Sequence, residues 1–200
     1  MLAGMTTSVH KGRATAMPIE ERRSTIVAAT LPLFLSQGAA ITTREIAQAA
    51  GIAEGTIFRV FPDKTALLDA VIEAALDPTP ADAAIERIDP DLPLEDRLVA
   101  AVEILRKRVL YLFRVFLAAS GTTRGARPER SHELPALTAI FATEAGRLSQ
   151  PPAEAARVLR GLTFACVHPS FGTDNPLTSE EIVAVLLDGI RHAAVGEPSC

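Results

Sequence analysis

Apolar residues recur at helical spacing along nearly the whole chain, and no segment reads as a β-hairpin. This pattern predicts an all-α protein of about nine helices. The predicted helices cover residues 19–37, 42–50, 54–60, 63–76, 81–88, 94–119, 133–148, 153–167 and 179–194. The second half of residues 94–119 is apolar nearly all round, which predicts a place in the centre of a helical bundle.

Glycine and proline mark several of the predicted helix ends. Gly38 follows the first helix at the position where a C-terminal glycine is common, and Pro62 stops the third. Pro32 lies inside the first helix, where it removes one backbone hydrogen bond and is expected to cause a kink.

Side-chain caps are predicted at three helix starts. Thr42 with Glu45, and Thr178 with Glu181, have the spacing of a capping box, in which each residue satisfies the backbone N–H of the other. Asp63 is placed to cap the fourth helix.

Composition and charge divide the chain into parts with different tasks. Residues 1–17 are predicted to be a mobile tail, residues 18–64 a small head and residues 65–200 a larger helical body. Residues 1–64 hold seven Lys and Arg against five Asp and Glu, a balance of +2, while the rest of the chain carries −6. The net charge of −4 argues against a general nucleic-acid binder, so a DNA-binding role has to rest on spacing.

The hydrophobic content of 48% excludes disorder for most of the chain. There is neither a signal-peptide pattern nor an apolar run long enough to span a bilayer. Cys166 and Cys200 lie in unrelated contexts, which indicates neither a disulfide framework nor a zinc site. A reduced, cytoplasmic setting is therefore expected.

Residues 42–64 have the spacing of a helix-turn-helix, in which two helices cross steeply at a very short turn. Counted from Thr43, small Ala47, Gly51, apolar Ile57 and apolar Val60 follow at offsets of 4, 8, 14 and 17. The small residue permits the close crossing, and glycine adopts the left-handed turn without steric cost. The alternative that this spacing leaves open is a helical hairpin that only packs a core.

The outward face of the second helix is free to enter a major groove. Ala53 precedes this helix, and Glu54, Gly55, Thr56 and Arg59 present small or polar side chains on it. Small residues let the backbone approach base edges, and the N-termini of both helices offer N–H groups to phosphates.

The segment ITTREIAQAAGIAEGTIFRVFPDKTALLDAVI resembles the DNA-binding signature of TetR-type transcriptional regulators, over residues 19 to about 76. The resemblance includes the ending F-P-x-K-x-x-L-L at residues 61–68. It implies that Thr43 and Lys64 contact phosphates and that Arg44 and residues 53–59 lie in or beside the major groove. The candidate DNA-binding residues are Thr42, Thr43, Arg44, Ala53, Glu54, Gly55, Thr56, Phe58, Arg59 and Lys64.

Two positions depart from the family pattern. Phe58 stands where Tyr or His is common, so its contact with DNA is expected to be apolar, for example with a thymine methyl group. Ala53 stands where a capping Ser is common, which predicts a weaker helix start.

Aromatic residues are scarce, and five of the nine fall between residues 111 and 164. The family resemblance implies that the body binds a small effector, and such a site is normally a mainly apolar cavity with a few polar groups. Core packing is the alternative for each of these rings. The candidate effector-binding residues are Tyr111, Phe113, Phe116, Phe141, Phe164 and His168.

The last two long helices combine apolar residues with small ones that permit close helix packing. The resemblance implies that these helices pair with those of a second copy as a four-helix bundle, and the alternative is that they complete the core of one chain. The candidate dimer-interface residues are Val158, Leu159, Leu162, Ala165, Ile182, Val185, Leu186 and Ile190.

These features predict a ligand-responsive regulator, a repressor that binds a pseudo-palindromic DNA operator as a homodimer and is released by a small, largely apolar effector. An activator or adaptor with the same head is the alternative. An enzyme is not expected, because the sequence lacks G-x-S-x-G, P-loop and G-x-G-x-x-G motifs. Cys166 and His168 are too few ligands for a metal site, and neither a metal nor a cofactor is expected.

Overall fold

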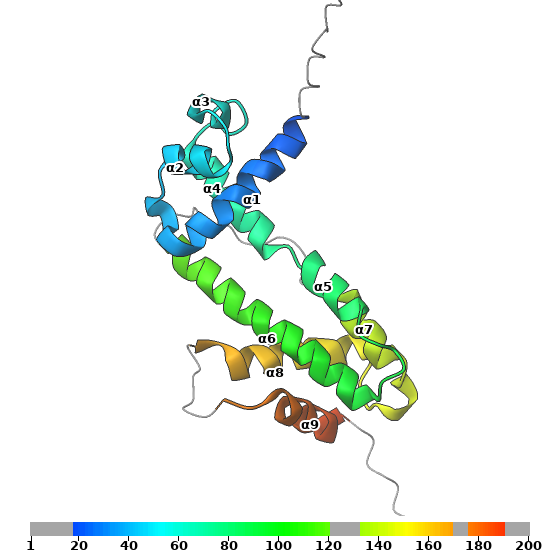
Figure 1. The fold of residues 1–200 in the computed structure, drawn as a ribbon. Helices are drawn as coiled ribbons and strands as arrows, with labels where there is room; N and C mark the ends of the chain where they lie inside the picture. Colours follow the sequence, from blue (N-terminus) through cyan, green and yellow to red (C-terminus); the bar gives the residue numbers. More distant parts are fainter. Residues whose placement is uncertain (1–17, 121–132, 170–175, 191–200) are drawn as a thin grey trace, which may run out of the picture.

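The computed structural model describes residues 18–120, 133–169 and 176–190, and the elements in this part of the chain are all helices (Figure 1). This confirms the predicted all-α class. The predicted tail at residues 1–17 lies outside the described residues. The elements are α1 (Ile19–Gln37), the 3₁₀ helix η1 (Gly38–Ala40), α2 (Thr43–Ala49), α3 (Glu54–Ile57), α4 (Lys64–Leu76), α5 (Thr79–Glu86), α6 (Leu94–Ala119), α7 (Pro135–Ala142), the 3₁₀ helix η2 (Ala145–Arg147), α8 (Pro152–Val167) and α9 (Ser179–Ile190).

Helices α1 to α4 share one hydrophobic core, so α4, which the sequence analysis assigned to the body, packs with the head and is counted with it from here on. α1 packs against α2 and α4, and α2 packs against α3. The largest fully buried side chains of this core are Ile26, Phe34, Ile41, Ile46, Ile57, Phe61, Leu67 and Ile72. α1 continues through Pro32 as one helix and ends at Gly38, as the glycine signal predicted.

Helix α6 belongs to both parts of the molecule. It crosses the body and reaches the underside of the head (Figure 1). Val115 and Ala119 near its C-terminal end are buried in the head core, where Tyr111, Leu112 and Ala118 also pack. The head is therefore seated on the end of a body helix as well as joined to the body through α4.

The predicted central position of the second half of α6 is wrong for the single chain. Leu110, Phe116 and Leu117 on this half are about half exposed or more. The head covers one side of this segment, and the remaining apolar side chains stay open to solvent. An all-round apolar pattern therefore did not indicate burial in the core of one chain.

The body core lies between α5, α6, α7, α8 and α9, and α6 packs against both α8 and α9. Leu98, Leu137, Phe141, Leu159 and Ile182 are fully buried in this core.

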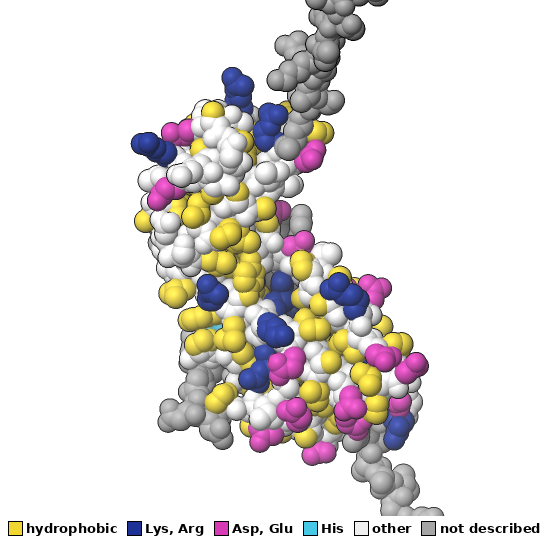
Figure 2. Space-filling view, viewed as in Figure 1, with side chains coloured by type: hydrophobic (Ala, Val, Ile, Leu, Met, Phe, Trp, Pro, Cys, Tyr) yellow, Lys and Arg dark blue, Asp and Glu magenta, His cyan; other side chains and the backbone are white. Residues whose placement is uncertain are grey.

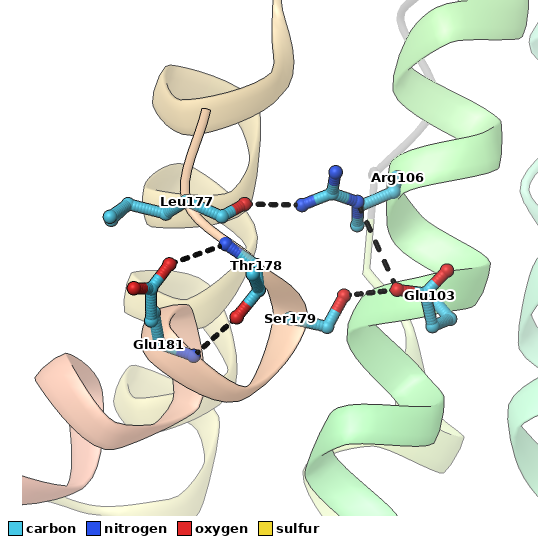
Figure 3. Close-up of polar contacts among 6 residues, drawn as sticks. All are labelled: Glu103, Arg106, Leu177, Thr178, Ser179 and Glu181. Atoms are coloured by element: carbon cyan, nitrogen blue, oxygen red, sulfur yellow. Dashed lines mark hydrogen bonds and ion pairs between the residues drawn. The ribbon is translucent and has the colours of Figure 1, made fainter. Parts of the chain in front are cut away.

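The start of α9 is held onto α6 by polar contacts (Figure 3). The Arg106 guanidinium donates a hydrogen bond to the Leu177 carbonyl at 2.7 Å, and the buried Ser179 hydroxyl donates to the Glu103 carboxylate. The predicted capping box is present: the Thr178 N–H donates to the Glu181 carboxylate at 2.8 Å, and the Glu181 N–H donates to the Thr178 hydroxyl at 3.2 Å. These contacts fix where α9 begins relative to the long helix.

Two predicted helices are shorter than the sequence indicated. α3 ends at Ile57 instead of Val60, because the following N–H groups of Arg59 and Val60 bond to carbonyls three residues back and tighten the last turn. The single helix predicted for residues 133–148 is α7 followed by the separate turn η2. The break follows Thr143, whose hydroxyl accepts a hydrogen bond from buried Arg97 at 3.0 Å, and the chain then turns so that Leu148 is buried.

Candidate nucleic-acid interface and ligand cavity

The capping box predicted at the start of α2 is present. The Glu45 N–H donates to the Thr42 hydroxyl at 3.2 Å, and the Thr42 N–H donates to the Glu45 carboxylate at 2.7 Å. Hydrogen bonds from Thr42 hold the pKa of Glu45 below the ordinary carboxyl range. The N-terminus of α2 is therefore locally ordered before any DNA is bound.

The turn between α2 and α3 has the geometry that the spacing predicted. Gly51 has φ = 65°, and the Ile52 N–H closes the turn on the Ala47 carbonyl at 3.0 Å. A Cβ atom at residue 51 would meet nothing within 4 Å, so glycine is required there for its left-handed conformation and not for space. Ala47 and Ile57 are buried where the two helices cross. The crossing is thus both a core contact and the base that orients α3.

Helix α3 presents its side chains to solvent at the outer end of the head. Gly55, Phe58 and Arg59 are exposed there, and Phe58 keeps 50% of its surface accessible. Ala53 is the N-cap residue of this helix and supplies no side-chain hydrogen bond to it.

Two candidate DNA-binding residues are bonded to each other. The Thr43 hydroxyl donates to the Glu54 carboxylate at 2.5 Å, which links α2 to α3. This bond orients the acidic group of Glu54 toward α2. It also engages the Thr43 hydroxyl, so that a phosphate contact at this residue would use its backbone N–H at the helix start.

The basic side chains of the head differ in their exposure to solvent and in their contacts with the protein. Arg44 and Arg59 are exposed, and Figure 2 shows Lys and Arg side chains standing at the outer end of the head. The Lys64 ammonium is half-buried and donates to the Ala39 carbonyl at 2.7 Å, which ties α4 to η1. An ammonium has three N–H donors, so others remain for a phosphate. Arg23, which the motif did not single out, lies 4.6 Å from the centre of the Phe61 ring in a cation–π contact.

A cavity of about 460 Å³ lies in the body where α4 ends, between α6 and α8. This size is ordinary for a small-molecule site. We call it the basic cavity, because three arginines and no acidic residue line it. Its wall consists of Leu76, Pro78, Leu105, Arg108, Val109, Leu112, Phe116, Leu134, Arg157, Arg160, Gly161 and Phe164.

Two of the six candidate effector-binding residues, Phe116 and Phe164, line this cavity, and four do not. Phe141 is fully buried in the body core, and Tyr111 packs against the head core, so these two rings have the packing role that was the alternative. The His168 ring lies 5.0 Å from Phe113 and 4.8 Å from Phe164, measured between ring centres. His168 therefore contacts Phe164, a residue of the cavity wall.

The sequence reasoning missed the arginines of the cavity. Arg108 donates to the carbonyls of Leu76 at 2.8 Å and Asp77 at 3.0 Å, the last residue and the C-cap of α4. The available signal was a basic residue at helical spacing from Leu105 and Leu112, on an otherwise apolar face of α6.

Burial dominates the electrostatics of this cavity. It lowers the pKa of Arg108, an effect that Asp77 and Tyr111 oppose and Arg160 reinforces. Burial also lowers the pKa of Arg160, which Glu133 opposes. Both guanidinium groups remain charged at neutral pH. Two poorly solvated positive charges therefore act on each other at the cavity.

The candidate dimer-interface residues divide into two groups. Leu159, Ile182, Leu186 and Ile190 are buried in the core of their own chain, and Leu162 packs partly against it, which corrects their assignment to an intermolecular surface. The large apolar residues that recur at helical spacing on α8 and α9 pack against other helices of the same chain and form part of its body core. The exposed members of the predicted set are Val158, Ala165 and Val185.

The described part of the chain contains no cluster of three or more His, Cys, Asp or Glu side chains that could hold a metal ion. Among the helices described, none is both long and apolar enough to cross a membrane.

Comparison with known proteins identifies the head. Residues 26–71 match the family model described as bacterial regulatory proteins, tetR family. A comparison with curated protein sequences gives no match.

Solved structures share the architecture at low sequence identity. A tetR-family transcriptional regulator from Streptomyces coelicolor has a TM-score of 0.57 and 19% identity, over 86% of this chain and 80% of that one. A TetR family transcriptional regulator from Pseudomonas syringae has a TM-score of 0.52 and 20% identity, over 84% and 96% of the two chains. A TetR family protein from Vibrio parahaemolyticus has a TM-score of 0.51 and 23% identity, over 86% and 99%. These likenesses extend the agreement in fold from the head to the body.

Proposed function

We propose that the chain, whose residues 26–71 match the tetR family model, is a ligand-responsive transcriptional repressor that binds its operator as a homodimer. The observation that carries this proposal is the connection between two sites. α4 begins under the exposed reading helix α3, and its last residue, Leu76, lines the basic cavity. A molecule in the cavity would therefore contact the helix that positions the head.

Two heads are needed because one head carries few basic groups. Arg44 and Arg59 are its exposed cations near α3, and a single domain with so few would bind DNA weakly. A twofold dimer presents two reading helices to successive major grooves of a pseudo-palindromic operator.

The exposed faces of α8 and α9 supply a surface for this dimer. Val158, Ala165 and Val185 are exposed together with Gly161 and Gly189, and a Cβ atom at either glycine would meet nothing within 4 Å. Small residues allow helices of two copies to approach closely. We therefore assign the dimer contact to these residues and not to the buried stripe beside them.

The effector would act by changing the distance between the heads. A ligand that prefers one head spacing by a few kcal/mol shifts most of the population to that state. The dimer then no longer fits two successive grooves, so it dissociates from the operator and transcription proceeds.

The DNA-binding proposal is tested with the DNA upstream of the chain's own gene. In a mobility-shift titration we expect a discrete complex that footprints over two half-sites about one helical turn apart. A reporter fused to this DNA should rise when the gene is deleted. A fall of the reporter would identify an activator, and the absence of any shifted DNA in a genomic selection would reject the regulator altogether.

The dimer proposal is tested by adding charge to the exposed face. Val185→Arg should convert the dimer to a monomer in sedimentation analysis, because it places a guanidinium in the contact. Leu92→Arg is the matched control, since Leu92 is also exposed but lies between α5 and α6. A Val185→Arg protein that remains dimeric would move the interface elsewhere.

A further inference from the structure

The basic cavity has a chemical bias that its apolar walls alone do not explain. Eight of its lining residues are apolar, and its charged members, Arg108, Arg157 and Arg160, are all cationic. Arg157 is mostly exposed and pairs with Glu154 on its own helix at 2.6 Å. Arg108 and Arg160 are both half-buried, so their charges face the interior of the cavity with less help from water.

Each of these two arginines has one acidic neighbour. Asp77 acts on Arg108 from the end of α4, and Glu133 acts on Arg160 from the segment before α7, while the two arginines repel each other. Neither Asp77 nor Glu133 is part of the cavity wall. An anion placed between the arginines would be attracted by both at once, and a guanidinium binds a carboxylate through two parallel hydrogen bonds.

The position of Arg108 links such an anion to the DNA-binding head. Arg108 holds the C-terminal carbonyls of α4, and α4 has no basic residue in its last turn to replace it. A carboxylate that pairs with Arg108 would compete with these neutral carbonyls, because it carries a full negative charge and can accept two parallel hydrogen bonds from the guanidinium. The end of α4 would then lose its attachment to α6.

We propose that the effector is an amphipathic monocarboxylate, whose carboxylate lies between Arg108 and Arg160 and draws Arg108 from the end of α4. This inference rests on the proposed function, because it names the ligand class of the same regulatory site. The sequence predicted a largely apolar effector. The proposal adds that this apolar molecule must carry one negative charge.

The charge requirement is tested by calorimetric titration of the full-length protein with decanoate and with decan-1-ol, which has the same chain and no charge. We expect decanoate to bind at least about tenfold more tightly, as one charge-assisted hydrogen bond implies. Titration with 4-phenylbutyrate, an aromatic carboxylate, shows whether the cavity prefers a ring or a linear chain as the apolar part of the ligand. Equal affinity for decanoate and decanol, or no binding of either carboxylate up to millimolar concentration, would overturn the ligand class.

The residues are tested with Arg160→Gln, which should weaken decanoate binding at least about tenfold and leave decanol binding unchanged. Arg160→Lys keeps the charge and should restore most of the affinity. Arg147→Gln is the matched control, because Arg147 is exposed and pairs with Glu144 at 3.2 Å outside the cavity. Wild-type decanoate affinity in folded Arg160→Gln would overturn the assignment.

The link to α4 is tested by hydrogen exchange over residues 74–79. Decanoate should speed exchange of these amides in the wild-type protein, and Arg108→Gln should speed it without ligand. Unchanged exchange in the decanoate-bound protein would overturn the link. None of these experiments uses DNA. If the protein binds no operator, the proposed function is rejected, but the results of the ligand experiments stay the same.

Discussion

Two pairs of arginines, one in the head and one at the basic cavity, have opposite surroundings. Arg44 and Arg59 stand in water at the outer end of the head, while Arg108 and Arg160 are half-buried beneath it. An exposed guanidinium keeps its solvation and gains most from a dense row of phosphates. A half-buried one has already lost part of its solvation, so a single small anion is enough to stabilise it. Exposure, more than the number of basic residues, therefore separates a DNA surface from a ligand site.

The largest expected effect concerns two glycines of the head, Gly38 and Gly51. Gly38 has φ = 62°, and a Cβ atom there would lie 3.0 Å from the Ala118 carbonyl oxygen of α6. Gly38→Ala should cost about 2–3 kcal/mol of unfolding free energy. Gly51→Ala, which adds a Cβ in open space, should cost about 1 kcal/mol. Urea unfolding measures both, and equal losses would show that the head is not seated tightly on α6.

We expect substitutions of Arg44 and Arg160 to affect different functions, DNA binding for Arg44 and ligand binding for Arg160. Arg44→Ala should weaken operator binding about tenfold and lower the slope of log affinity against log salt by about one. Arg160→Gln should leave operator affinity within about twofold, because it lies away from the DNA face. Fluorescence anisotropy at several salt concentrations measures both variants. An Arg160→Gln protein with a reduced salt slope would remove the distinction between the two sites.

Lys64 is intermediate between the two pairs of arginines, because it is half-buried yet belongs to the DNA-binding motif. Lys64→Met should lower stability by about 1 kcal/mol through the lost bond to the Ala39 carbonyl. If the ammonium also contacts a phosphate, the salt slope falls by about one. A lower stability with an unchanged slope would make Lys64 purely structural.

Thr42→Ala should destabilise the head by about 1 kcal/mol, since it removes the capping box of α2. Because the folded-state pKa of Glu45 is lowered, its carboxylate stabilises the head above the ordinary carboxyl pKa, and this contribution is lost as the pH falls through the lowered pKa. The difference between Thr42→Ala and wild type should therefore shrink in acid. Thr65→Ala, at an exposed position of α4, is the control and should show no such trend.

The smallest expected effect is at Phe58. Because half of this ring is exposed, Phe58→Tyr should leave stability within about 0.5 kcal/mol. If the ring lies beside the DNA backbone, the added hydroxyl supplies a phosphate contact and tightens operator binding a few-fold. If it instead packs on a thymine methyl, affinity falls or stays constant, and anisotropy titrations distinguish these outcomes.

Local chemistry explains why the head was predictable from sequence. A capping threonine, a left-handed glycine and a proline act within a few residues, so Thr42, Gly51 and Pro62 predict the same turns in isolation as in the folded chain. The bounds of α1 and α6 followed from periodicity for the same reason. The length of α3 did not, since its last turn tightens only when Phe61 is drawn into the head core.

The sequence by itself therefore determined the all-α class, the helix-turn-helix and the likeness of the head to the tetR family. Only the tertiary structure decided which apolar residues face inward: Phe141 and Leu159 are core, while Phe164 lines a cavity and Val185 is exposed. It also decided that Arg108 and Arg160, 52 positions apart in the chain, act on each other at one cavity. The physical reason is that periodicity gives a helix an apolar face, but the partner of that face depends on how distant segments pack.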